Sequence, residues 1–142
     1  MAKQLSIFVE NKPGKLEKIT DTLADGGFNI RGISMANAGE FGIVKIIVDR
    51  PEEAYSYLIS HKITVSTRNI TAVRIGDRPG SLHDMLTILS GNNINIEDCY
   101  GVSVAYNKSA AIILEIEKCP EAIEVLKLHN IDILTDREIY SL

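Results

Sequence analysis

Apolar residues show the same two periodic patterns, one after the other, in both halves of this chain. An alternating run of Leu5, Ile7 and Val9 is typical of a half-buried strand, and Val73 and Ile75 repeat that alternation later. Each run is followed by apolar residues at spacings of three and four, which predict an amphipathic helix. These helical positions are Leu16, Ile19 and Leu23 in the first half, and Leu82, Met85 and Leu89 in the second. The pattern therefore predicts a strand and then a helix in both halves.

The rest of each half predicts a second strand, a third strand, a second helix and a last strand. Polar turns at 25–27 and 91–93 end the first helices, and Pro51 and Pro120 begin the second ones. The second strand of the later half is predicted to alternate through Ile94, Ile96, Tyr100, Val102 and Val104. Third strands are predicted at 42–49 and 110–117, and the last strands are carried by Ile63, Val65, Ile131 and Ile133.

The two halves are copies of one unit. Shifting the chain by 66 positions aligns Pro13 with Pro79 and Asn29 with Asn95, and a shift of 68 aligns His61 with His129. We therefore expect an α+β protein with two tandem ferredoxin-like β-α-β-β-α-β units, 1–67 and 68–142, with the helices on one face of each antiparallel sheet. Units this small bury little surface and expose long strand edges. The units are expected side by side as an eight-stranded sheet, and the chain as a homodimer.

Composition narrows the class of protein. The 142 residues are 45% hydrophobic with a net charge of −4, so a phosphate-neutralising nucleic-acid surface is not expected. An RNA-binding version of this fold would also need aromatic residues on the central strands, which are nearly free of them. No apolar run is long enough to span a bilayer, and the start of the chain lacks signal-peptide features. Cys99 and Cys119 have no CxxC or histidine partners, which favours reduced thiols in a cytoplasmic protein over a disulfide or metal pair.

A Pro-Gly turn stands before the first helix of each copy, as NKPGKL at 11–16 and DRPGSL at 77–82. We expect the proline at the first helical position, where no backbone N–H is needed. The N–H groups of Gly14, Lys15 and Leu16 would then be unpaired beside the positive end of the helix dipole, which suits a carboxylate.

The residue that opens each turn adds a second kind of contact. Asn11 or Asp77 could accept a hydrogen bond from an ammonium group, so one loop offers partners for both ends of a free amino acid. Asn29 and Asn95 open the second strands at matching positions, where a buried or half-buried amide would need a partner. The alternative is that the loops are ordinary strand-to-helix turns and the asparagines residual turn residues.

Two copies of [D/N]-[K/R]-P-G-x-L, each followed by a helix and then [F/I]-N-I, resemble tandem ACT domains over nearly the whole chain. The resemblance implies a regulatory module that binds amino acids, with the ligand between two ACT units. It would join loop 11–16 with Asn95, and loop 77–82 with Asn29. The ligand-binding positions predicted in this way are Asn11, Pro13, Gly14, Lys15, Leu16, Asn29, Ile30, Asp77, Pro79, Gly80, Ser81, Leu82, Asn95 and Ile96.

The two predicted sites differ. Asn11 stands opposite Asp77, and the acidic Glu97 and Asp98 replace Arg31 and a glycine, so one site could work while the other is structural. The acidic pair points to a polar or cationic ligand side chain, such as that of histidine or lysine.

Neither catalysis nor a cofactor is expected from this sequence. The histidines His61, His83 and His129 are scattered, and His61 and His129 lie at predicted helix ends, where an imidazole suits the dipole. His83 lies beside the second loop, where it could touch a ligand or simply face water. We expect a non-enzymatic protein that binds a free L-amino acid and regulates amino-acid metabolism in trans. The alternative is a ligandless interaction module, or a regulatory subunit that docks on a biosynthetic enzyme.

Overall fold

The structure, a computed structural model, describes residues 1–103 and 109–142, with the side chain of Ser103 excluded. It divides into two compact units. The first unit comprises Lys3–Arg68 with Ser141, and the second comprises Asn69–Tyr140 with Met1–Ala2 and Leu142. How the units pair, and the eight-stranded arrangement expected of them, stay predictions.

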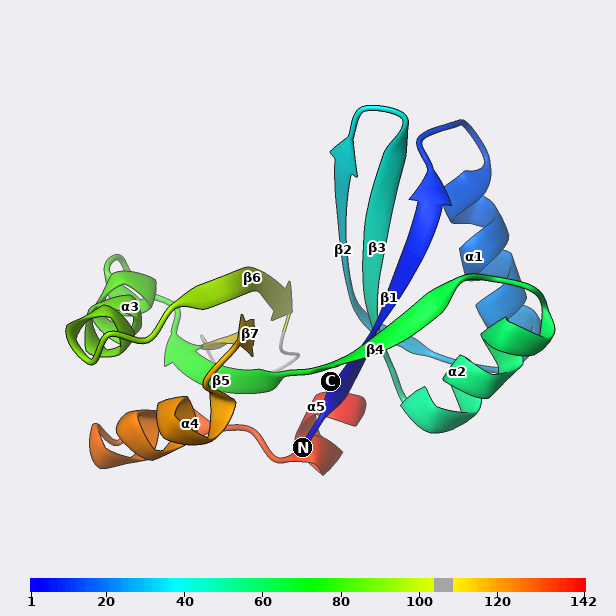
Figure 1. Cartoon of the computed structure of the whole chain (residues 1–142). Helices are drawn as coiled ribbons and strands as arrows, with labels where there is room; N and C mark the ends of the chain where they lie inside the picture. Colours follow the sequence, from blue (N-terminus) through cyan, green and yellow to red (C-terminus); the bar gives the residue numbers. More distant parts are fainter. Residues whose placement is uncertain (104–108) are drawn as a thin grey trace. The chain divides into compact units, whose positions relative to one another are not determined.

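Each unit has the expected β-α-β-β-α-β order (Figure 1). The first unit contains β1 (Lys3–Glu10), α1 (Lys15–Asp25), β2 (Ile30–Ala38), β3 (Phe41–Val48), α2 (Pro51–Ser60) and β4 (Val65–Asn69). The second contains β5 (Thr71–Gly76), α3 (Ser81–Gly91), β6 (Ile96–Ser103), β7 (Ser109–Ile116), α4 (Cys119–Leu128), β8 (Asp132–Ile133) and a short α5 (Asp136–Tyr140). The four-stranded sheets have the orders β2-β3-β1-β4 and β6-β7-β5-β8, which confirms the α+β fold predicted from the sequence.

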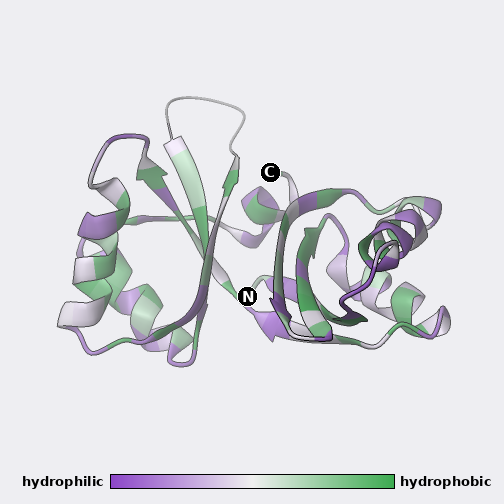
Figure 2. Cartoon of the chain, turned by 90° about the horizontal axis from the view of Figure 1, so that it is seen from above, coloured by the Kyte–Doolittle hydropathy of each residue, from purple (hydrophilic) through white to green (hydrophobic). Residues whose placement is uncertain are grey.

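The helices of each unit cover one face of its sheet and bury the apolar positions that the spacing predicted. In the first unit, Ile19 and Leu23 of α1 pack with Leu5 and Ile7 of β1. In the second, Met85 and Leu89 of α3 pack with Val73 of β5. Hydrophobic and hydrophilic residues alternate along the helices and strands, as expected of elements that bury one side (Figure 2).

The four helices predicted from the sequence end in the same way. The residue after each C-cap has a positive φ, and the next N–H reaches back to the last turn, which is the Schellman arrangement. In α1, Gly27 has a φ of 73° and Phe28 N–H donates to the Leu23 carbonyl at 3.0 Å. The residues with positive φ at the other three ends are Lys62 (60°), Asn93 (56°) and Asn130 (56°). The polar turns at 25–27 and 91–93 therefore end helices as predicted.

One strand departs from the predicted alternation. A bulge between Ile96 and Asp98 shifts the register of β6, so that Ile96 lies opposite Ile116 whereas Tyr100 lies opposite Ile113. Directly opposed residues share a face, and the bulge therefore turns Tyr100 to the face opposite that of Ile96. The prediction of one uninterrupted alternation was wrong for this reason. Its last position, Val104, lies outside the described residues.

The short helix α5 was not predicted. Its start is a capping box, in which the Thr135 hydroxyl accepts from Glu138 N–H at 3.2 Å and the Glu138 carboxylate accepts from Thr135 N–H at 2.8 Å. The backbone N–H and then the hydroxyl of Thr135, which both donate to the Glu138 carboxylate, hold the pKa of Glu138 below its ordinary value, and the charge of Arg74 contributes a smaller effect. Ile139 is buried, so the helix places one apolar side chain out of contact with water.

Candidate functional site

The predicted loops are type II β-turns rather than the first turns of helices. Lys15 N–H donates to the Lys12 carbonyl at 3.3 Å, and Gly14 between them has φ 83° and ψ −7°, the values of the third turn position. The second copy repeats this geometry at Gly80, with φ 87° and ψ −10°. The predicted placement of Pro13 and Pro79 at the first helical position was wrong, because a left-handed glycine separates each proline from its helix.

This geometry changes the set of backbone donors at α1. The N–H of Lys15 already has its turn acceptor, whereas the first bond of the helical ladder runs from Lys18 N–H to the Gly14 carbonyl at 3.0 Å. The N–H groups of Leu16 and Glu17 precede that bond and point beyond the helix end, where an anion can reach them. The predicted donor set of Gly14, Lys15 and Leu16 therefore loses Lys15.

The opening residues of the two loops have different surroundings. Asn11 is tied to the β2–β3 turn, because its Nδ2 donates to the Gly39 carbonyl at 3.0 Å and its backbone N–H donates to the Glu40 carbonyl at 2.7 Å. That orientation uses the amide's donor and leaves Oδ1 as the acceptor that an ammonium group requires. Asp77 is exposed.

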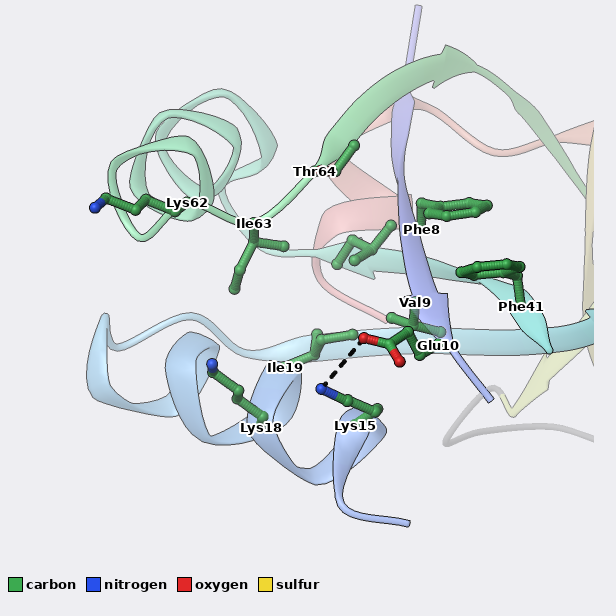
Figure 3. Close-up of a pocket in the computed structure, with 11 residues that line it drawn as sticks. Phe8, Val9, Glu10, Lys15, Lys18, Ile19, Phe41, Lys62, Ile63 and Thr64 are labelled. Atoms are coloured by element: carbon green, nitrogen blue, oxygen red, sulfur yellow. Dashed lines mark ion pairs between the residues drawn. The ribbon is translucent and has the colours of Figure 1, made fainter. Parts of the chain in front are cut away.

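Lys15 also has a side-chain contact that the sequence did not indicate. Its Nζ lies 3.7 Å from Oε1 of Glu10 at the end of β1 (Figure 3). The Nζ of Lys12 lies 2.9 Å from the same carboxylate. The hydrogen bond and charge of Lys12, followed by the charge of Lys15, hold the pKa of Glu10 below its ordinary value. The corresponding residue of the second loop, Ser81, has no charge.

Ser81 of the second loop has a buried hydroxyl that lacks a hydrogen-bond partner among the described residues. The residue is 7% exposed. It stands directly after Gly80 at the start of α3. Because buried hydroxyls are nearly always hydrogen-bonded, the missing partner makes this atom a candidate ligand contact at the helix start. Leu82 is 40% exposed beside it, whereas Leu16 of the first loop packs against the core.

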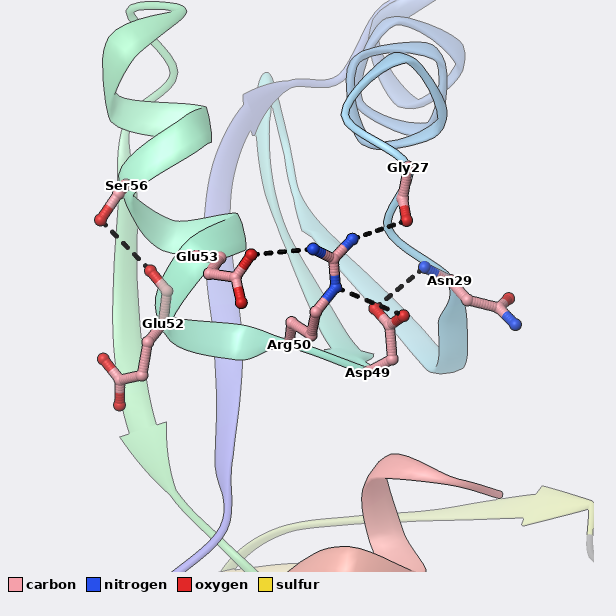
Figure 4. Close-up of polar contacts among 7 residues, drawn as sticks. All are labelled: Gly27, Asn29, Asp49, Arg50, Glu52, Glu53 and Ser56. Atoms are coloured by element: carbon pink, nitrogen blue, oxygen red, sulfur yellow. Dashed lines mark hydrogen bonds and ion pairs between the residues drawn. The ribbon is translucent and has the colours of Figure 1, made fainter.

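The two strand asparagines are exposed, which corrects the expectation of buried or half-buried amides. Asn29 uses its backbone to pair with Asp49, donating N–H to the carboxylate at 3.1 Å and accepting from Asp49 N–H at 3.1 Å. Its side chain points away from this contact (Figure 4). Asn95 lines a groove of about 340 Å³ together with His83 of α3 and Ile96 of β6. The second unit thus brings together three residues that the sequence singled out.

Arg50 organises the neighbourhood of Asn29, and sequence reasoning missed it. Its guanidinium donates to the Gly27 carbonyl at 2.9 Å and to Glu53 at 2.8 Å (Figure 4). It also lies over the Phe28 ring, 4.7 Å from the ring centroid. Arg50 thereby joins the α1–β2 turn to the start of α2. The pairing of an arginine with a glutamate three positions later was visible in the sequence, but its contacts with the distant turn were not.

The cysteines and two of the histidines have surroundings that explain them structurally. Burial raises the pKa of the thiols of Cys99 and Cys119, both of which are free, so neither favours a reactive thiolate. His61 and His129 cap their helices, with Nδ1 atoms 2.8 Å and 2.9 Å from the carbonyls of Tyr57 and Val125. Within residues 1–103 and 109–142, no three His, Cys, Asp or Glu side chains could hold a metal ion together. No helix in that part of the chain is long and apolar enough to cross a membrane.

Comparisons with known proteins agree with this geometry. A structure of protein BT0572 from Bacteroides thetaiotaomicron matches 99% of this chain and 96% of its own, with 34% identity and a TM-score of 0.93. The ligand-free regulatory subunit of aspartate kinase from Thermus thermophilus shares the fold, at 20% identity and a TM-score of 0.63 over 89% of this chain and 91% of its own. No curated protein matches significantly. The family model described as an ACT domain pair matches residues 1–142, and the chain therefore belongs to the ACT domain pair family.

Proposed function

We propose that this protein is a non-catalytic regulator that binds a free L-amino acid between ACT units and controls an enzyme of amino-acid metabolism in trans. The observation that carries the proposal is the buried hydroxyl of Ser81, which has no partner among the described residues and stands at the start of α3. A carboxylate at that helix start would accept from the hydroxyl and from the first backbone N–H groups. The dipole of α3 would favour the same negative charge.

The groove of Asn95 would form part of the other predicted site, the one that loop 11–16 completes. Its volume of about 340 Å³ lies at the small end of ligand sites, as suits a free amino acid. His83 and Asn95 supply polar contacts there, and Ile96 supplies an apolar wall. Loop 11–16 of a neighbouring unit would add the backbone donors of α1 and Oδ1 of Asn11. A ligand held by two units would favour the arrangement that brings them together, which is the basis of regulation.

A second copy of the chain is the partner that we propose for this assembly. Ile33 and Met35 of the outer strand β2 are 44% and 46% exposed, so the first sheet presents an apolar border along its unpaired edge. Pairing such an edge with another chain in a symmetric homodimer would remove both apolar surface and open backbone groups from water. The similar Thermus thermophilus protein is a regulatory subunit of aspartate kinase, which supports a biosynthetic enzyme as the regulated partner.

A thermal-shift screen of the twenty amino acids tests the proposal. Ligand at one hundred times its Kd should stabilise the protein by about 2.7 kcal/mol. Ser81→Ala should leave the unliganded melting temperature unchanged or slightly higher, because it removes a hydroxyl that lacks a partner, but should weaken the response to the ligand. Ser56→Ala on the exposed side of α2 is the matched control. Asn95→Ala and Asn29→Ala, compared in the same screen, would identify which of the two sites operates.

The outcomes separate the two candidate functions. No stabilisation by any amino acid at millimolar concentration would exclude this ligand class. Co-purification with a larger enzyme, without an amino-acid response, would instead support a ligandless interaction module. Sedimentation showing only monomer at micromolar concentration would contradict the homodimer.

A further inference from the structure

The first unit contains a second groove, of about 340 Å³, beside the end of β1. Figure 3 shows Lys15 and Lys18 on α1 and Lys62 on the turn after α2, with Ile19 and Ile63 facing the space between these elements. The rest of the apolar lining comes from Ile7, Phe8 and Val9 of β1 and from Phe41 of β3. We refer to this feature as the lysine groove. It combines an apolar floor with amino groups, in a protein whose net charge is −4.

Two of the three lysines are not neutralised. Glu10 is the carboxylate that lines the lysine groove, and both Lys12 and Lys15 lie close to it, at 2.9 Å and 3.7 Å. Among the described residues, Lys18 and Lys62 have no ion-pair partner. The groove therefore presents a net positive charge carried by flexible side chains, which suits a carboxylate or phosphate.

Lys62 also stands where the backbone does not favour a lysine. It occupies the left-handed position after α2 with a φ of 60°. The equivalent positions after α1, α3 and α4 are Gly27, Asn93 and Asn130, which are residue types that tolerate this conformation. The helix end alone does not favour a lysine here, so Lys62 is a candidate for a role of its own.

The second unit provides an internal comparison. The repeat aligns Lys15 with Ser81, Lys18 with Asp84, and Lys62 with Asn130. The backbone at these places is alike, since α1 and α3 both follow a left-handed glycine, and α2 and α4 both end in the same turn. The second unit therefore adopts the same fold without lysines at these three positions. The fold does not require the three lysines of the first unit, which leaves them free to bind a ligand.

We propose that the lysine groove binds a small organic anion, with its apolar body on the isoleucines and its carboxylate or phosphate between Lys18 and Lys62. The volume is that of a small-molecule site. Lys15 belongs both to this groove and to loop 11–16, but Ser81, Asn95 and the backbone N–H groups of Leu16 and Glu17 take no part in the anion site, so the two proposals can be tested separately.

Titration of the 15N-labelled 142-residue chain with hexyl phosphate, hexanoate, hexanol and inorganic phosphate tests the proposal by amide chemical shifts. Both hexyl anions should shift the amides of Lys18, Ile19, Lys62 and Ile63, whereas hexanol and inorganic phosphate should bind much more weakly. The double variant Lys18→Gln with Lys62→Gln should bind hexyl phosphate about tenfold more weakly. Its charge-matched control is Lys118→Gln with Lys127→Gln, two exposed lysines of the second unit, which should bind like the unmodified chain.

Three results would overturn the proposal. Equal weakening in the two double variants would mean that only net charge matters. If hexanol bound as tightly as hexyl phosphate, the lysines would have no role in binding. If inorganic phosphate bound as tightly as hexyl phosphate, the isoleucines would have no role. Comparing hexyl phosphate with hexanoate identifies the preferred anionic group. An amino-acid response that survives in the lysine variant would show that the two sites are separate.

Discussion

Replacing Gly14 with alanine should destabilise the first unit through the backbone alone. Gly14 has a φ of 83° in its type II turn, and a methyl group added there would meet no atom within 4 Å. Steric contact with the surroundings therefore contributes nothing, and the cost is that of an alanine in the left-handed region, about 1–2 kcal/mol. Part of this is offset, because alanine reduces the freedom of the unfolded chain by about 0.4–1 kcal/mol. We expect a net loss of about 1 kcal/mol, with a similar loss for Gly80→Ala at φ 87°.

Gly91→Ala is the matched control. The added methyl group again meets nothing within 4 Å, but Gly91 lies in the last turn of α3 without a positive φ. Alanine is preferred over glycine in a helix by about 0.5–1 kcal/mol, so this variant should be as stable as the unmodified chain or more so. Urea unfolding followed by circular dichroism gives the free energy of unfolding of all three variants. In a thermal melt, a loss of 1 kcal/mol should lower the melting temperature by roughly 2–4 °C. If Gly14→Ala and Gly91→Ala had the same stability, the type II turn would be refuted.

Three further predictions concern single side chains. Arg50→Met should lower the free energy of unfolding by about 1–2 kcal/mol in urea, because it breaks the tie between the α1–β2 turn and α2, whereas Lys118→Met at the equivalent position should cost little. Lys62→Asn should raise that free energy by about 0.5–1 kcal/mol, since asparagine tolerates its positive φ; an unchanged value would contradict strain there. The pKa of Glu138 is lowered in the folded protein, so its contribution to stability is present above the ordinary pKa of a glutamate and is lost as the pH falls through the lowered folded pKa. In acid titrations by circular dichroism, Glu138→Gln should lack that part of the pH dependence, and Thr135→Ala should reduce it; identical curves would contradict the capping box.

Much of the fold was predictable because each element has a local periodic signal and is written twice. Leu16, Ile19 and Leu23 define one helix face, and the second copy confirms the spacing. The β6 bulge was not predictable, because alternation along one strand cannot show where an extra residue interrupts pairing with its neighbour. Helix α5 was missed because five residues have little periodicity, although the Thr135–Glu138 capping box was a readable signal.

The site was less predictable than the fold, because side-chain partners come from distant segments. A proline has nearly the same φ at the second position of a turn and at the start of a helix, so the sequence did not separate these alternatives for Pro13. The positive φ of Gly14 decides between them. The burial of the Ser81 hydroxyl likewise depends on tertiary packing. The position of Lys62, by contrast, had a readable signal, because the repeat aligns it with Asn130, a residue typical of helix ends.

The duplication separates what the fold requires from what it leaves open. Gly14 and Gly80 have the same positive φ in the two copies and tolerate it, so their recurrence is explained by turn chemistry and is not in itself a sign of a ligand. Positions that share a backbone but differ in charge are more informative, since the fold does not determine their identity. Lys18 and Asp84 are such a pair. The turn motif therefore locates the two candidate sites, and the residues that differ around it give each copy its own chemistry.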